Sequence, residues 1–172
     1  IREGRNYVSE GTRHCMELKV NEQQRGENGS ELKLSKPGKV HATARVAALL
    51  NPKPNPEIQN RPYSQKPYWD VERARLKNSR EVAVELIVNG YPVAKKNLVA
   101  DGTIQEISFD ATIDRSSWVA MRILASSHTN PIFVVMDEKP VRASRRSAEW
   151  CLQGVEKCWS QKQRFIKANE MD

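Results

Sequence analysis

A strict alternation of apolar and polar residues constrains the fold of this chain more than any other feature. It is clearest where every second residue is apolar: Val40, Ala42, Ala44, Val46, Ala48 and Leu50. Because successive side chains of a strand point to opposite faces, this period of two predicts a strand with one buried face. His41 falls on the opposite face, and we expect it to be solvated.

Short strands of this kind recur along the first 140 residues, and turn signals separate them. The alternation over 82–88 runs directly into Asn89-Gly90, the strongest short signal for a β-hairpin. Further strand patterns lie at 16–20, 32–34, 91–96, 107–113, 118–124 and 132–136. Since no helical segment separates the strands, a parallel sheet with crossover helices is not expected. The pattern indicates a mainly β fold, an antiparallel sandwich or barrel. Of these we expect an antiparallel Ig-like β-sandwich over residues 1–143.

A proline-rich segment, "NPKPNPEIQNRPYSQKP", interrupts the strands at residues 51–67. Proline lacks the N–H donor that a sheet ladder needs, so this segment cannot be a central strand. At this length it predicts a long loop, and long loops in compact domains often carry function. Tyr63, Tyr68 and Trp69 either pin the loop to the surface or offer an aromatic platform to a ligand.

From Ser144 the apolar spacing changes to that of a helix. The stripe consists of Ala148, Cys151, Val155, Cys158 and Trp159, with Trp150 and Leu152 beside it. We expect a helix over 144–167 that packs on the sandwich or on a neighbouring domain, and a frayed tail over 168–172. Cys151 and Cys158 would lie roughly 10 Å apart on one face, too far for a disulfide. We expect both to be small buried apolar residues.

The basic excess of the chain is concentrated near its C-terminus. The net charge is +7, and residues 142–167 hold seven basic residues, among them Arg142 and Arg145, against two glutamates. Such a segment suits an anionic partner or is a solvated helix face. The strands do not interleave basic and aromatic residues, so nucleic-acid binding is not expected. No apolar stretch approaches the roughly 20 residues of a membrane helix, so no membrane insertion is expected.

The residues that could carry chemistry are few and scattered. The histidines are His14, placed before the first strand, His41 in a strand, and His128 in the segment "ASSHTNPIFVV". We expect His128 to lie in a turn between two strands. Ser127, His128 and Asp137 could be arranged as a triad, but adjacent residues of one turn rarely meet its geometry. No phosphate-binding glycine loop or zinc motif occurs. The sequence predicts no catalytic residue, metal ligand or cofactor in this segment.

Three long stretches resemble a known family. They are "GRNYVSEGTRHCMELKV" (4–20), "SREVAVELIVNGYPVAKK" (79–96) and "RSSWVAMRILASSHTNPIFVVMDEKPVRASRRSAEWCLQGVEKCW" (115–159). Together they resemble the C-terminal region of bacterial PHP-superfamily metal-dependent hydrolases of the CehA/McbA, carbaryl-hydrolase-like type. The resemblance covers nearly the whole chain. It implies a parent with a divalent-metal catalytic domain upstream of Ile1, in a bacterium and either periplasmic or secreted.

The resemblance implies an accessory role for this chain, and whether the chain is itself an enzyme is left open. The chain would pack on the upstream catalytic domain, shape its substrate entrance, or form a homo-oligomer. Candidate interface or binding residues are His128, Asn130, Tyr63, Tyr68, Trp69, Arg142, Arg145, Trp150 and Trp159. The alternative is an independent binding module for carbohydrate or an anionic polymer, with the aromatic residues after the proline-rich segment as its platform.

Overall fold

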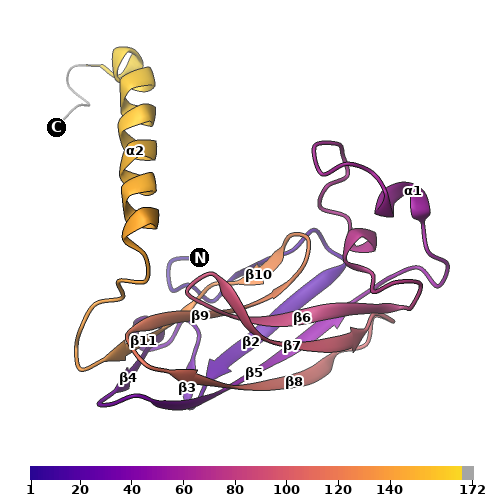
Figure 1. Cartoon of the computed structure of the whole chain (residues 1–172), viewed down its shortest axis with the longest axis horizontal. Helices are drawn as coiled ribbons and strands as arrows, with labels where there is room; N and C mark the ends of the chain where they lie inside the picture. The colour runs from indigo at the N-terminus through magenta and orange to yellow at the C-terminus, as the bar shows by residue number, and fades with distance from the viewer. Residues whose placement is uncertain (168–172) are drawn as a thin grey trace. The chain divides into compact units, whose positions relative to one another are not determined.

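The chain is mainly β, with two sheets followed by one C-terminal helix (Figure 1). The computed structural model describes residues 1–167. It divides into two compact units, Ile1–Val141 and Arg142–Asp172. Each unit is described by itself, and the tail predicted to fray, 168–172, lies outside the described residues.

The larger sheet, called sheet A, is built around strand β9. Strand β6 pairs with β9 along one edge, and β10 and β11 pair with different parts of the same strand. Strand β7 pairs with β6, β1 with β10, and β4 with β11. Only the β4–β11 pair among the described strands is parallel, a departure from the expected antiparallel pairing. The strands of sheet A are β1 (Tyr7–Val8), β4 (Glu31–Leu34), β6 (Glu81–Val88), β7 (Tyr91–Val99), β9 (Ser117–Ile123), β10 (Ser127–Thr129) and β11 (Ile132–Met136).

The smaller sheet, called sheet B, has the order β3-β2-β5-β8 and is antiparallel throughout its described strands. Its strands are β2 (Arg13–Val20), β3 (Gln23–Gln24), β5 (Gly38–Ala48) and β8 (Gln105–Ile113). The helical segments are α1 (Pro56–Gln59), α2 (Arg145–Lys162) and the short 3₁₀ turns η1 (Asn28–Ser30), η2 (Val71–Ala74) and η3 (Gln163–Phe165).

Strand β2 departs from the alternation that the sequence predicts. A strict period of two would place Met16 on the inner face with Leu18 and Val20. Instead Cys15, Leu18 and Val20 are wholly buried, and the pairing with β5 shifts register between Met16 and Lys19. Glu17 has a positive φ of 51° inside this shift. The extra residue forms a β-bulge, which shifts the alternation of inward and outward side chains by one position. Met16 therefore does not lie on the inner face, where a strict period of two would place it.

The predicted hairpin at Asn89-Gly90 is confirmed. Strands β6 and β7 pair antiparallel across it, and both turn residues have positive φ, 52° and 93°. A two-residue hairpin turn that matches the twist of its strands requires this conformation at both positions. His41 is also solvated as predicted, with its Nδ1 2.7 Å from the Oδ1 of Asp110 on the outer face of sheet B.

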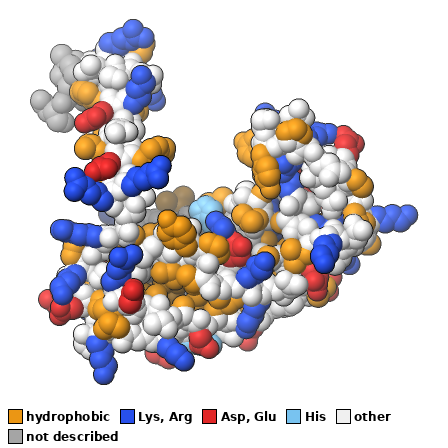
Figure 2. Space-filling view, viewed as in Figure 1, with side chains coloured by type: hydrophobic (Ala, Val, Ile, Leu, Met, Phe, Trp, Pro, Cys, Tyr) orange, Lys and Arg blue, Asp and Glu red, His pale blue; other side chains and the backbone are white. Residues whose placement is uncertain are grey.

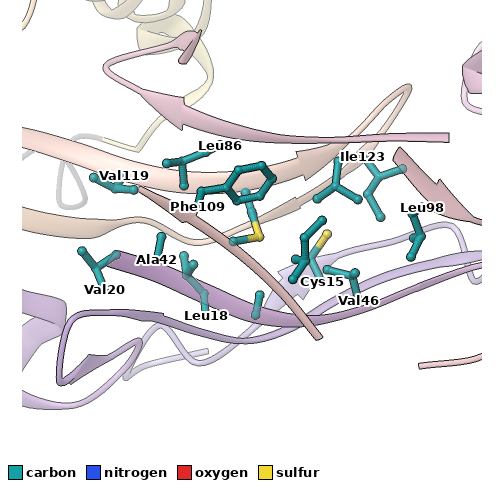
Figure 3. Packing of buried hydrophobic residues seen from close by; sticks show 14 of the residues in the cluster. Cys15, Leu18, Val20, Ala42, Val46, Leu86, Leu98, Phe109, Val119 and Ile123 are labelled. Atoms are coloured by element: carbon teal, nitrogen blue, oxygen red, sulfur yellow. The ribbon is translucent and has the colours of Figure 1, made fainter. Parts of the chain in front are cut away.

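The core lies between the two sheets and draws on the inner face of each. Figure 3 shows Leu86, Val119 and Ile123 of sheet A facing Leu18 and Val46 of sheet B, all of them buried. Full burial of such a side chain is worth about 1.5–3 kcal/mol relative to exposure. The sandwich therefore supplies its own stability and leaves the outer faces of its sheets free for other contacts.

Replacing Leu86 by Ala should lower the free energy of unfolding by about 2–5 kcal/mol, because the side chain is wholly buried and leaves a cavity. Urea denaturation followed by tryptophan fluorescence measures this change. The exposed Asn97, replaced by Ala, is the control and should change stability by less than about 0.5 kcal/mol. An equal effect of both substitutions would contradict the packing described here.

Candidate functional site

An apolar hollow lies on the outer face of sheet A. It encloses about 500 Å³, and much of its wall consists of Ile87, Trp118, Ala120, Pro131 and Phe133. The register of the sheet produces it, because Ile87 pairs with Ala120 and Phe133 pairs with Trp118. Alternation on β9 sends Val119, Met121 and Ile123 into the core and leaves the intervening residues on the outer face. In the space-filling view, hydrophobic side chains gather between charged ones along the sandwich (Figure 2).

A charged pair stands at the margin of this hollow. Nε of Arg122 donates to Oε2 of Glu85 at 2.7 Å, and the two residues are direct cross-strand partners. Arg122 is only partly exposed, and the carboxylate of Glu85 supplies the charged partner that a partly buried guanidinium requires. A pair of this kind fixes the guanidinium plane beside the apolar wall and gives the hollow a polar edge.

His128 lies in strand β10, so its predicted placement in a turn is wrong. It pairs with Val8 of β1 and with Arg122 of β9, and the turn falls just before it at 124–126. Three residues are too few to produce a readable alternation, which is why the sequence did not reveal this strand. The imidazole is exposed and lines the hollow, with Nδ1 3.2 Å from the carbonyl oxygen of Thr129.

The neighbouring Ser127 points away from His128 into the sandwich. Its Oγ donates to the carbonyl oxygen of Val8 at 2.9 Å, and its side chain is buried. Adjacent strand residues face opposite sides of the sheet, so Ser127 and His128 do not form a nucleophile–base pair. His14 lies inside β2 rather than before the first strand, and its Nδ1 is 2.7 Å from the hydroxyl of Tyr7.

Asn130 joins the rim of the hollow to the N-terminal segment. Its Nδ2 donates to Oδ1 of Asn6 at 3.1 Å and to the carbonyl oxygen of Gly4 at 3.3 Å. Because Asn130 also lines the hollow, the first residues of the chain and the hollow are held in one arrangement. This places His128 and Asn130, two of the predicted interface residues, together at one surface.

A buried ion pair supports the turn that precedes β10. Nε of Arg13 lies 3.0 Å from both carboxylate oxygens of Glu10, and Arg13 has no exposed surface. Its terminal nitrogens donate to the carbonyl oxygens of Leu124 and Trp69 and, at 3.0 Å, to Oγ of Ser126. Burial raises the pKa of Glu10, but the hydrogen bonds from Arg13 and Thr12 outweigh it and hold that pKa below its usual value. The sequence carries no signal for this pair beyond a basic residue at an inward position.

A second buried pair anchors the proline-rich segment, which contains α1 and stands at one end of the sandwich (Figure 1). Nε of Arg75 lies 2.6 Å from Oε1 of Glu72, and its Nη2 donates to the carbonyl oxygen of Asn51 at 2.7 Å. The same carboxylate accepts from the backbone N–H of Asn55 and from Nε2 of Gln59. These bonds hold the loop at its start and its middle through a single buried ion pair.

The aromatic residues at the end of this loop do not form a flat platform. Tyr63 is 76% exposed, and the guanidinium of Arg73 lies 4.3 Å from its ring centroid. Tyr68 and Trp69 meet edge to face, with an angle of 88° between their planes. Rings in these orientations suit local packing of the loop better than stacking on a flat ligand.

The predicted binding residues of the second unit are all on its surface or partly exposed. Trp150 is 73% exposed, Trp159 is 48% exposed, and Arg145 binds Glu149 within the helix at 2.8 Å. Arg142, in the segment before α2, is exposed as well. The expectation that Cys151 and Cys158 are buried is wrong, because none of the residues of α2 is buried.

Residues 1–167 contain no group of three histidine, cysteine, aspartate or glutamate side chains placed to hold a metal ion. Among the same residues, no helix is long and apolar enough to cross a membrane. No protein-family model, curated protein or solved structure matches the chain.

Stability should depend on pH through the buried glutamates. Burial raises the pKa of Glu72. The hydrogen bonds from Arg75 and Asn55 lower it by more than burial raises it, so the pKa lies below the usual 4.5. A lowered folded-state pKa contributes stability above the unfolded-state value, and this contribution is lost as the pH falls. Glu72→Gln should cost about 3 kcal/mol at pH 7 by leaving Arg75 without its carboxylate.

Urea unfolding between pH 7 and pH 3 checks this expectation. The gap in stability between the native chain and Glu72→Gln should narrow as the pH falls below about 4.5, where the unfolded chain takes up the proton. The exposed Glu57, replaced by Gln, is the control and should follow the native profile. A gap that stays constant over the whole range would show that ionisation of Glu72 is not involved.

Proposed function

We propose that this chain is a non-catalytic accessory domain that packs its sheet A face against the catalytic domain of a metal-dependent hydrolase. The observation that carries the proposal is the hollow around Trp118. An apolar depression with two aromatic side chains, surrounded by polar groups, has the anatomy of an interface centre and its rim. The rim groups are the Arg122–Glu85 pair, His128 and Asn130.

The catalytic domain is chosen as the partner because the hollow and the family resemblance fall on the same residues. Trp118, His128 and Phe133 lie in the segment 115–159, and Gly4 and Asn6 lie in 4–20, two of the three segments that carry the resemblance. The resemblance supplies an upstream domain that holds divalent metal. The finer fold class of the proposal is an Ig-like sandwich, which two face-to-face sheets support.

Within this proposal, the N-terminal segment provides the connection. Asn130 binds Asn6 and the carbonyl oxygen of Gly4, so the path of residues 4–6 runs beside the hollow. A domain joined through this segment would start next to the surface it is proposed to cover. Packing there would also place His128 at the boundary of the two domains, where it can shape the substrate entrance. The edge-to-face rings after the proline-rich segment do not favour the alternative of a carbohydrate platform.

The isolated chain should retain no stoichiometric metal and hydrolyse no ester. Elemental analysis after incubation with Zn²⁺ or Mn²⁺ and gel filtration measures the bound metal, and a chromogenic ester measures activity. Tight metal retention that disappears on His128→Ala would overturn the accessory role, because it would place a metal centre on this chain.

The hollow can be tested by placing a charge in its apolar wall. Phe133 is a partly exposed strand residue, and Phe133→Asp should weaken binding of the chain to the separately expressed catalytic domain by on the order of tenfold or more. The loss follows from burying an unpaired carboxylate in an apolar interface. Isothermal titration calorimetry with both purified domains gives the affinity.

The matched control is Thr112→Asp, which places the same charge at an exposed strand position on the outer face of sheet B. It should leave the affinity unchanged. Circular dichroism of both variants establishes that the sandwich is folded. Equal affinities of the two variants for the catalytic domain would exclude sheet A as the docking face.

A further inference from the structure

Helix α2 exposes its whole apolar stripe. Leu152 is 59% exposed, Val155 67% and Trp159 48%, and Figure 2 shows hydrophobic side chains between basic ones along the helix. Most of the stability of a helix in a protein comes from packing of its apolar face, and none of the 18 residues of α2 is buried. A partner that covers this stripe would supply the missing stabilisation, and the sequence of the stripe identifies which partner fits.

The stripe follows a heptad spacing. Ala148 and Val155 are seven residues apart, Cys151 and Cys158 form a second such row, and Leu152 and Trp159 a third. Rows at this spacing stay on one side of a helix and form the contact seam of a two-helix coiled coil. We propose that α2 pairs with α2 of a second copy of this chain, parallel and in register, along this seam.

Gly154 gives an independent reason for a close neighbour. Glycine inside a helix costs about 0.5–1 kcal/mol relative to alanine. A Cβ at Gly154 would meet nothing within 4 Å among the described residues, so packing inside the chain does not account for it. The missing side chain leaves room beside the seam for a group that comes from outside.

Parallel pairing fills that room with a residue of the second copy. In a parallel coiled coil, a residue on one flank of the seam meets the residue five positions later on the other helix. Gly154 then faces Trp159 of the second helix, and Ser147 faces Leu152. Each small residue meets a large one, so the flanks of two α2 helices are complementary in size.

The absence of charge beside the apolar stripe of α2 favours a second copy over an acidic partner. The flanking positions between Ser147 and Gln161 carry no charge, whereas Arg146, Glu149, Glu156 and Lys157 lie outside the seam. An acidic partner would need basic residues next to the stripe, where they could reach its carboxylates. Lys162 continues the row of Ala148 and Val155, and because it is charged, the apolar seam ends there. Because the helix carries a net positive charge, salt should strengthen self-pairing by screening repulsion.

The two cysteines of the seam allow the geometry to be tested directly. In a parallel pair, Cys151 faces Cys151 of the second copy and Cys158 faces Cys158, so Cys151→Ser and Cys158→Ser should each still form a disulfide-linked dimer. Mild oxidation of the full chain with copper phenanthroline, followed by non-reducing electrophoresis, detects these dimers. Cys15 does not interfere, because it is wholly buried and burial raises the pKa of its thiol to about 11.

The control for proximity is a single cysteine outside the seam, in the triple variant Cys151→Ser, Cys158→Ser, Gln153→Cys. It should remain monomeric under the same oxidation. Cross-linking that requires both native cysteines would indicate an antiparallel pair and overturn the proposed geometry. Equal cross-linking of the control would indicate random collision and overturn the pairing itself.

Association without oxidation tests the role of Gly154. Gly154→Leu should raise the helicity of α2, since leucine is the better helix former, yet weaken dimerisation of the full chain about tenfold by displacing Trp159 of the second copy. Gln153→Leu, outside the seam, is the matched control and should leave dimerisation unchanged. Sedimentation equilibrium at two salt concentrations gives both affinities, and the native dimer should tighten with salt.

Three outcomes exclude the pairing. The first is a chain that stays monomeric up to about 1 mM, where even a weak complex would form. The second is Gly154→Leu association equal to or stronger than native, and the third is a dimer that weakens with salt. The proposed role of sheet A involves none of these residues, so its test and this one fail independently.

Discussion

The guanidinium of Arg13 lies where no water reaches it, and its need for acceptors determines how three separate segments meet. The carboxylate of Glu10, the carbonyl oxygens of Trp69 and Leu124, and Oγ of Ser126 supply those acceptors. The N-terminal segment, the end of the proline-rich loop and the turn before β10 are therefore fixed around one charge. Such a group costs several kcal/mol if it loses its partners, so the arrangement is rigid.

The two surfaces that we assign to partners differ in how they are built. The hollow of sheet A is formed by strand register, and its shape is set by side chains on four strands before any partner arrives. The stripe of α2 lies on a single helix with no buried residue, and such a helix lacks the packing from which helices gain most of their stability. A partner of the sandwich meets a preformed surface, whereas a partner of α2 also stabilises the element it binds.

Sequence reasoning succeeded where one physical rule acts alone. The alternation over 40–50 predicts a long strand with His41 outside, and Asn89-Gly90 predicts its hairpin, because each depends on local geometry. It failed where contacts between distant segments determine the local structure, as for the bulge at Glu17 and the strand that contains His128. The two buried ion pairs were not foreseen, since an inward-facing arginine is readable only once its partners are placed. The hollow itself depends on pairing between strands distant in the sequence, although two of its residues, His128 and Asn130, were anticipated.

The parallel pair of β4 and β11 has a consequence for how the chain reaches its native state. Val134 lies beside Leu32, so this edge of the sheet joins segments about a hundred residues apart. Contacts of such long range carry a large loop-closure entropy and form late, which slows folding. On the ribosome, β4 must wait until β11 has been synthesised before it gains its neighbour. During that interval the early strands expose unpaired edges and apolar faces, the features through which incompletely folded chains aggregate.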